Sequence, residues 1–308
     1  MQLRHIRYLI AAAEEEHFGK AAERLCVTRS AVSQLVADLE NEWEIALFER
    51  QAQKIKLTAA GRAMLPRLKD VMLELEQIVD LGKRVGQGKS GQLIVGYGSL
   101  STHHPIFREA VKRYHQDYPD VVLTLVEIPT SRQMHAMREG EIHAGFMHIQ
   151  STIAQSAAKS NESHSQVIDK ASLGLIVPKD HRLARKGSAQ LRDLAGEQLV
   201  MTHNWRESPA FGGLFSLCRS SGFEPRVIQE VSATVTQQDL VSVGVGIGVS
   251  VIGGMHTYPP EISVIAITDV DYDITFQLSH MYGRVEPVLD TFINVVQQCT
   301  VGQISASE

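Results

Sequence analysis

The amino-acid sequence predicts an α/β protein with an N-terminal winged helix-turn-helix, a long linker helix and a larger C-terminal α/β domain. Three observations lead to this prediction. Two short helical patterns joined by a tight turn lie near the N-terminus, and a hairpin pattern follows them. One long amphipathic pattern comes next. After residue 91, strand patterns alternate with helix patterns, which is typical of a parallel sheet covered by helices.

Length and composition describe an ordinary globular protein. The chain has 308 residues, so more than one folding unit is expected. No apolar run approaches the ~20 residues that span a bilayer, and the N-terminus has no signal-peptide pattern. The three cysteines are far apart and match neither a disulfide framework nor a zinc motif. We therefore expect a cytoplasmic protein with no membrane partner, no cofactor and no metal.

The segment 18–37 predicts the helix-turn-helix itself, after a first helix over 3–15. Thr28 is placed to cap the second helix of the motif, and Val32, Val36 and Leu39 recur at the spacing of a buried helix face. The opposite face is polar and carries Arg29, Ser30, Ser33 and Gln34. In a helix-turn-helix this face enters the DNA major groove. Taken alone, the pattern also fits a plain amphipathic helix pair.

The stretch from Leu47 to Thr58 predicts two short strands with a polar tip at residues 51–54, the wing of the domain. Arg50, Lys54 and Lys56 lie on this wing and would contact phosphates or a minor groove. A solvated basic hairpin is the alternative. The formal net charge of −5 does not exclude DNA binding, because phosphate neutralisation depends on local cations.

Several motifs in this region resemble the LysR-type transcriptional regulators, and the likeness extends over nearly the whole chain. The residues that carry it are Leu3–Leu9, Phe18, Ala21-Ala22, Ser33, Leu39-Glu40, Leu47–Arg50 and Leu57–Gly61. The resemblance implies a winged helix-turn-helix, a linker helix and a two-lobed effector domain like that of periplasmic binding proteins. It is nearest to the branch that senses aromatic acids and their ring-cleavage products. One departure is that the family's usual Leu-Gly before the Leu-Phe pair is here Trp43-Glu44.

Residues 59–85 predict the linker helix, which Pro66 is expected to kink or delay. A heptad-like apolar seam runs along it and predicts pairing with the same helix of a second chain through Leu68, Met72, Leu75 and Val79. Packing against the chain's own C-terminal domain is the alternative. A dimer of helix-turn-helix units matches a pseudo-palindromic site on double-stranded DNA, so we expect a homodimer or homotetramer. The glycine-rich segment 86–91 is expected to act as a hinge.

The C-terminal region predicts strands at 93–97, 121–128 and 143–149, with helices at 105–117 and 131–139 between them. Residues 151–165 are polar and irregular, a second set of α/β units covers 167–249, and a strand at 274–281 and a helix at 285–298 close the chain. The pattern alone allows two independent α/β domains. The family resemblance implies one domain in which the chain crosses twice between its lobes. The expected domains are 1–58, 59–90 and 91–308, with lobe I at 91–165 and 268–308 and lobe II at 166–267.

The loops that follow strands predict a small-molecule site. In open α/β sheets, ligands bind outside the carboxyl ends of strands, where helix N-termini favour a carboxylate. The effector-binding candidates are Ser99, Leu100, Ser101, Thr102, Thr130 and Ser131 from the first lobe, and Trp205 and Phe211 from the second. Arg206 is a candidate charge partner. His103 and His104 are expected to be surface histidines, and titration together with the ligand is the alternative. For each hydroxyl, a plain helix cap is the alternative.

The predicted function is therefore sequence-specific DNA binding that is switched by a small organic acid, either aromatic or dicarboxylic. RNA polymerase is a further expected partner. The alternative is a small-molecule-binding α/β protein or an enzyme with an N-terminal interaction domain. No nucleophile elbow and no metal-binding cysteine or histidine motif is present, so no catalytic residue is predicted. The Val-Gly repeat at 243–248 follows a helix pattern, and we interpret it as a tight turn rather than a nucleotide loop.

Overall fold

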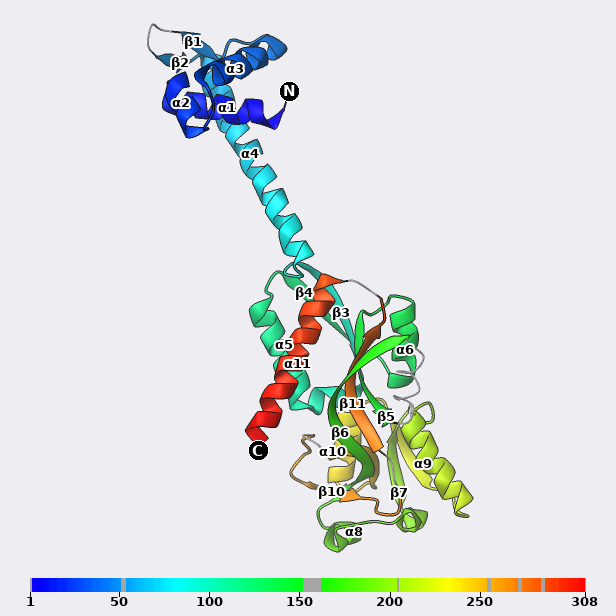
Figure 1. Ribbon diagram of the computed structural model, residues 1–308. Coiled ribbons are helices and arrows are strands. Elements are labelled where there is room, and N and C mark those ends of the chain that lie inside the picture. The colour runs from blue at the N-terminus through cyan, green and yellow to red at the C-terminus, as the bar shows by residue number, and fades with distance from the viewer. Residues whose placement is uncertain are drawn as a thin grey trace. The chain divides into compact units, whose positions relative to one another are not determined.

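The computed structural model describes residues 2–50, 54–151, 162–203, 205–253, 256–270, 273–283 and 286–307. The chain forms two compact units, Met1–Lys83 and Arg84–Glu308 (Figure 1). No helix in the described part of the chain has both the length and the apolar character needed to cross a membrane.

The first unit is a winged helix-turn-helix, as predicted. Its elements are α1 (Leu3–Glu15), α2 (Phe18–Arg24), α3 (Arg29–Trp43), β1 (Phe48–Arg50), β2 (Ile55–Leu57) and most of α4 (Ala59–Gly86). The strands β1 and β2 pair antiparallel, with Phe48 opposite Leu57. Its core gathers apolar side chains from the three short helices and the hairpin, among them Leu9, Ala12, Phe18, Ala22, Val32, Val36, Leu39, Leu47 and Ile55.

Two polar side chains hold the wing against the helices. The carboxylate of Glu40 accepts hydrogen bonds from the backbone N–H groups of Leu47, at 2.6 Å, and Phe48, at 2.9 Å. The hydroxyl of Thr58 donates to the carbonyl oxygen of Ala46 at 2.8 Å and accepts from the N–H of Gly61 at 3.0 Å. A Cβ on Gly61 would lie 2.5 Å from the Leu47 carbonyl oxygen, so only glycine fits this joint.

The helix α4 begins at Ala59, well before Pro66, and continues through it to Gly86. The expectation that Pro66 delays the helix is therefore wrong. Thr58 precedes the first turn and bonds the N–H of Gly61, so the helix starts from this cap and not from the proline.

The second unit is built on a seven-stranded sheet with the order β10-β6-β11-β5-β3-β4, in which β9 also pairs with β6. Its strands are β3 (Gly91–Tyr97), β4 (Val121–Glu127), β5 (Ala144–Gln150), β6 (Ser163–Pro178), β9 (Gly248–Ile252), β10 (Ile262–Ala266) and β11 (Asp273–Met281). β3 runs parallel to β4 and β5, whereas β11 is antiparallel to β5 and β6.

The long strand β6 joins two halves of this unit. Its first part, Ser163–Ser172, pairs with β11, and its second part, Ser172–Pro178, pairs with β9 and β10. We call lobe I the half with β3, β4, β5, β11 and the first part of β6, and lobe II the half with the second part of β6, β9 and β10. The chain crosses from lobe I to lobe II in β6 and returns in β11, so the alternative of two independent α/β domains is wrong. Of the segment expected to be irregular, residues 163–165 belong to β6, and residues 152–161 lie outside the described residues.

Helices cover both faces of the sheet in lobe I. They are α5 (Pro105–Asp117), α6 (Thr130–Arg138) and α11 (Pro287–Ser307), and a short 3₁₀ helix, η1 (Ser99–His103), precedes α5. The consecutive β5 residues Phe146 and Met147 belong to different apolar clusters, because side chains alternate across a strand. Phe146 belongs to the cluster that contains side chains of α5 and α11, and Met147 to the cluster that contains side chains of α6.

Lobe II adds the parallel pair β7 (Gln198–Thr202) and β8 (Arg226–Val231). Its helices are α8 (Arg182–Lys186), η2 (Leu191–Gly196), α9 (Pro209–Ser220) and α10 (Thr234–Ser242). An apolar cluster fills this lobe and includes Leu175, Met201, Leu214, Phe215 and Val249. Residues 243–247 connect α10 to β9, which confirms that the Val-Gly repeat is a helix-to-strand turn.

Candidate functional site

The N-terminal part of α3 presents a polar face to solvent. The hydroxyl of Thr28 accepts a hydrogen bond from the N–H of Ala31 at 3.3 Å and caps the helix, as the sequence predicts. Val32 and Val36 are buried, whereas Arg29 is exposed on the other side. The predicted contact residues Ser30 and Gln34 are exposed as well, and Ser33 is half-buried. This is the arrangement that a recognition helix needs.

The side chains of this face differ in how free they are. Gln34 donates to the carboxylate of Asp38 at 2.8 Å, and Ser33 donates to the carbonyl of Ser30 at 3.4 Å. Arg29 forms no ion pair within the described part of the chain. A DNA contact by Gln34 would therefore replace an existing hydrogen bond, while a contact by Arg29 would not.

On the wing, Lys54 and Lys56 are exposed and flank the buried Ile55. Arg50 pairs with Ile55 through the backbone of β1, and its side chain is not among those described. Residues 51–53 of the predicted polar tip also lie outside the described residues. Two of the three predicted wing cations are thus displayed to solvent.

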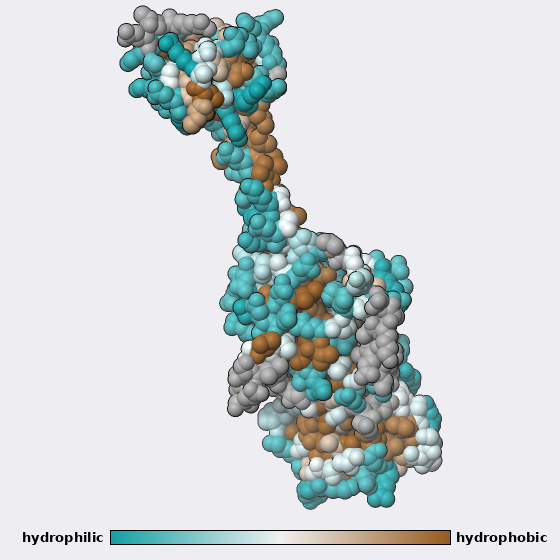
Figure 2. Space-filling model, in the orientation of Figure 1, coloured by the Kyte–Doolittle hydropathy of each residue, from teal (hydrophilic) through white to brown (hydrophobic). Residues whose placement is uncertain are grey.

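The predicted seam of α4 divides into two parts. Leu68 is half-buried against the core of the first unit, and Met72 is buried. Farther along, Leu75 is half-buried and Val79 is 51% exposed. Other exposed apolar side chains of α4 are Val71, Leu73, Ile78, Leu81 and Val85, and Figure 2 shows apolar surface along this helix. The start of the seam packs within its own unit, and only its later part is left for another surface.

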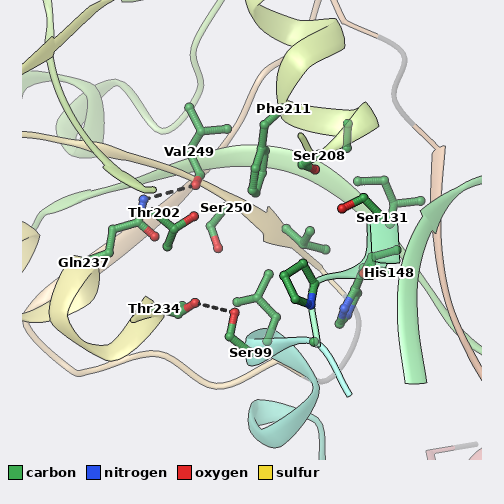
Figure 3. Close-up of a pocket in the computed structure, with 17 residues that line it drawn as sticks. Ser99, Ser131, His148, Thr202, Ser208, Phe211, Thr234, Gln237, Val249 and Ser250 are labelled. Atoms are coloured by element: carbon green, nitrogen blue, oxygen red, sulfur yellow. Dashed lines mark hydrogen bonds between the residues drawn. The ribbon is translucent and has the colours of Figure 1, made fainter. Parts of the chain in front are cut away.

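A cleft lies between the two lobes of the second unit, with about 750 Å³ of empty space that is partly open to solvent (Figure 3). Lobe I lines it with Gly98, Ser99, Leu100, Pro129, Thr130, Ser131, His148 and Ile274. Lobe II lines it with Thr202, Ser208, Ala210, Phe211, Thr234, Gln237, Val249, Ser250 and Val251. Hydroxyl groups and apolar side chains therefore meet in one space.

Three α-helices of the described chain begin at this cleft. They are α6 at Thr130, α9 after Ser208 and α10 at Thr234, and no side chain caps any of them. The cap positions of α6 and α10 hold Pro129 and Ala233, whose side chains have no hydrogen-bonding atom. The N-termini of three helices, which are the positive ends of their dipoles, thus lie at the edge of the cleft, an arrangement that suits an anion.

One hydrogen bond bridges the cleft directly. The hydroxyl of Thr234 in lobe II donates to the hydroxyl oxygen of Ser99 in lobe I at 2.8 Å (Figure 3). Nearby, the amide of Gln237 donates to the Val200 carbonyl at 2.7 Å and holds α10 on β7. The lobes are therefore in contact at the wall where the hydroxyl groups gather.

Comparisons with known proteins agree with both halves of this structure. Residues 3–62 match the model of the bacterial regulatory helix-turn-helix protein, lysR family, and residues 86–299 match that of the LysR substrate binding domain. The chain belongs to the LysR family. It is therefore a DNA-binding transcriptional regulator with a substrate-binding domain and not an enzyme, and the enzyme alternative is wrong.

Relatives of this regulator match it over nearly its full length. The transcriptional regulator AlsR of Bacillus subtilis (strain 168) is 28% identical over 96% of this chain and 95% of its own. CatR of Pseudomonas putida is 29% identical over 97% of this chain and 99% of its own. Among solved structures, full-length CbnR complexed with its target DNA has a TM-score of 0.73 at 20% identity, covering 97% of this chain and 100% of that one. At this identity the structural match shows the shared fold.

Five of the eight predicted effector residues line the cleft, namely Ser99, Leu100, Thr130, Ser131 and Phe211. The other three do not. Ser101 is buried, and its hydroxyl points to the carbonyl of Phe146 at 3.5 Å. Thr102 is exposed and donates to the Ser99 carbonyl at 3.0 Å. Both face away because η1 turns the chain between them, so that only its first residues reach the cleft.

Trp205 is the third residue that the structure places elsewhere. It is 7% exposed in the core of lobe II, where its ring packs on Phe215 with 4.1 Å between centroids. The guanidinium of Arg206 lies 4.4 Å above this ring and forms an ion pair with Glu230 at 2.6 Å. That arginine, with the Trp205 N–H, lowers the pKa of the Glu230 carboxyl. Both the expected aromatic surface and the expected charge partner are therefore used inside lobe II.

The expectation of a surface histidine is wrong for His104. His104 is fully buried, and its Nε2 lies 3.1 Å from a carboxylate oxygen of Asp169. His103 is half-buried, and burial is the main cause that lowers its pKa. Neither lines the cleft.

Sequence patterns miss several cleft residues, including His148, Thr202, Ser208, Thr234, Gln237 and Ser250. Thr234 opens a helix directly after the strand β8, so the rule that selects Thr130 could have found it. His148 lies near the carboxyl end of β5, a position to which the same rule applies. It is the one titratable side chain among the described residues that line the cleft. No group of three or more metal-binding side chains occurs in the part of the chain that the structure describes.

Proposed function

We propose that this regulator binds double-stranded DNA through α3 and the wing, and that a small organic acid bound in the cleft switches this binding. The acid is aromatic or dicarboxylic, and the protein acts in the cytoplasm. The observation that supports the binding of an acid in the cleft is the convergence of three uncapped helix N-termini on a space lined by hydroxyl groups. Exposed Arg29, Lys54 and Lys56 support the DNA contact.

The cleft also suggests how a ligand acts. A carboxylate held by Ser99, Thr130 and the N–H groups of α6 would bring lobe I against the ligand, and its apolar part would contact Phe211 of lobe II. Such a ligand has a higher affinity for one lobe arrangement than for another. It can shift the equilibrium between them only by that difference in affinity.

The working form we propose is a homodimer or homotetramer that pairs through the later part of α4 and binds a pseudo-palindromic site. The exposed apolar side chains at Ile78, Val79, Leu81 and Val85 support this pairing, because water contact with so many apolar groups on one helix is unfavourable. RNA polymerase is a further proposed partner at the promoter.

An electrophoretic mobility shift with the DNA fragment upstream of the protein's own gene tests this function. We expect a retarded band that survives an excess of unrelated DNA and that changes when a panel of aromatic and dicarboxylic acids is added. A thermal-shift screen with the same panel identifies the acid that binds. Binding that unrelated DNA removes, or a complex that no acid affects, would contradict the proposal.

A further inference from the structure

The charge of the cleft wall is unusual for an anion site. Among the described residues that line the cleft there is no lysine and no arginine. The acidic side chains are absent from this set as well, so His148 is its one titratable group. Any compensation for a ligand's charge by a side chain of this wall must therefore come from His148.

His148 belongs to a small cluster that joins the lobes. Its Nε2 lies 3.0 Å from Nε2 of His256, which follows β9 in lobe II. The ring of Phe276, on β11, stacks on His148 and lies tilted against His104, with 4.6 Å between centroids in each case. His104 in turn contacts Asp169 of β6. The titratable groups around His148 are therefore His256, His104 and Asp169, and β11 contributes an apolar ring.

The hydrogen bonds determine where the protons of the pair lie. The carbonyl oxygen of Gly253 accepts only, and it lies 3.2 Å from Nδ1 of His256, so this nitrogen carries the proton. In the neutral ring, Nε2 of His256 then has a lone pair and accepts from Nε2 of His148. The remaining nitrogen, Nδ1 of His148, holds a lone pair and has no hydrogen-bond partner among the described residues.

Without a ligand, protonation of His148 at Nδ1 is unfavourable. Burial, followed by the neighbouring His256 and His104, holds the pKa of His148 well below its usual range, and Asp169 opposes them. A carboxylate in the cleft would add a negative charge near the ring and favour the charged form. Binding an anion and binding a proton would then support each other.

We propose that His148 determines the charge of the ligand: the cleft takes a monocarboxylate with an apolar body, and Nδ1 of His148 takes up a proton from solvent as the carboxylate binds. This inference rests on the proposed function and narrows its class of acids. A second carboxylate would find no cation on the described wall, which carries Leu100, Phe211 and Val249 as its apolar part. Dicarboxylates are therefore the weaker ligands.

Isothermal titration calorimetry of the full chain tests this with three probes of similar shape: benzoate, its neutral analogue benzamide and the dianion phthalate. Titration in two buffers of different ionisation enthalpy counts the protons taken up. We expect more than zero and at most one proton per benzoate, none with benzamide, and an affinity for phthalate at least about tenfold lower, equivalent to ~1.4 kcal/mol. Benzoate affinity should rise as the pH is lowered towards about 6, because protonated His148 becomes easier to form.

The matched variants are His148→Gln, whose amide can still donate to His256 but does not titrate, and His164→Gln, which changes an exposed histidine of β6. Proton uptake should disappear in H148Q and persist in H164Q.

Uptake of no proton by the wild type, equal uptake in H148Q, or tighter binding of phthalate would overturn the inference while leaving the proposed function intact. If DNA binding responds to other acids but none of these probes binds, the inference is overturned as well. A failure of specific DNA binding in the mobility shift would instead contradict the proposed function.

Discussion

Ser99 and Thr234 are joined by a hydrogen bond of 2.8 Å that links lobe I to lobe II at the wall of the cleft. Because Thr234 is the donor, the oxygen of Ser99 accepts, and the hydroxyl hydrogen of Ser99 remains for another acceptor. A ligand carboxylate is such an acceptor. The same residue could thus contact the opposite lobe and an anion together, so we expect Ser99 to couple ligand binding to the arrangement of the lobes.

The recognition helix gives the first prediction. Replacing Arg29 or Ser33 with alanine should weaken specific binding by ~1–3 kcal/mol for each base or phosphate contact that the replacement removes. Arg113→Ala, which removes a partly exposed cation of α5 in the second unit, should leave the affinity unchanged. Fluorescence anisotropy with the upstream fragment at constant salt measures all three variants. Wild-type affinity in both α3 variants would show that this face is not the DNA contact.

Assembly gives the second prediction. Leu75→Asp places a charge in the later part of the α4 seam, where pairing would bury it at a cost of several kcal/mol. Light scattering should then show a smaller species than the wild type, and operator binding should disappear. Gln77→Asp adds the same charge at an exposed position of the same helix and should keep the wild-type mass. A Leu75→Asp variant with unchanged mass and DNA affinity would mean that the seam does not pair chains.

The end of α3 gives the third prediction. Glu44 has φ 55° and ψ 33°, a left-handed conformation that side chains disfavour, at the position where the family usually has glycine. Glu44→Gly should therefore stabilise the first unit by ~0.5–1 kcal/mol. Glu23→Gly, in the right-handed helix α2, should instead destabilise it by about 1 kcal/mol. Scanning calorimetry compares the two, and a Glu44→Gly variant that melts below the wild type would refute the assignment of strain to this residue.

Acid sensitivity of the second unit gives the fourth prediction. Burial is the main cause that lowers the pKa of His148, His256 and His280, so the unfolded chain binds more protons than the folded one as the pH falls below ~6.5. The free energy of unfolding should therefore decrease on acidification from about pH 7.5 to about pH 5.5, by about 1 kcal/mol for a histidine whose folded pKa is far below 6.5.

Urea unfolding followed by Trp205 fluorescence measures this, in a Trp43→Phe background so that only the second unit reports. His148→Gln should reduce the pH dependence, because glutamine does not titrate. The same pH dependence in wild type and variant would rule out His148 as a source of it.

The parts of the fold that could be predicted from sequence are those fixed by neighbouring residues. Thr28 caps α3 through the N–H of Ala31, three residues away, and the helix bounds Leu3–Glu15 and Pro105–Asp117 agree with the expected ranges. The helix-start rule likewise selects Thr130 and Ser131, which line the cleft. In each case the determining contact lies within a few positions along the chain.

The residues that sequence patterns misplace depend on contacts between distant segments. Trp205 is held in lobe II by Phe215 and by Glu230, which accepts from its indole N–H at 3.3 Å. His104 is buried because Asp169, on a strand 65 positions away in the chain, reaches its ring. His148 meets His256 across the lobes. No local pattern indicates such pairings, since they arise only when segments distant in the sequence pack together, within one lobe for Trp205 and His104 and across the two lobes for His148.

The most direct test of the central claim is DNase I footprinting of the upstream fragment with wild type and Ser99→Ala, with and without the acid that binds best in the thermal-shift screen. Removing the Ser99 hydroxyl deletes a charge-assisted hydrogen bond and should lower ligand affinity by ~1 kcal/mol or somewhat more. We predict identical footprints without ligand, and a ligand-dependent change that needs about five- to tenfold more acid in the variant. A footprint that responds to the same acid concentration in both proteins would contradict the assignment of the cleft as the switch.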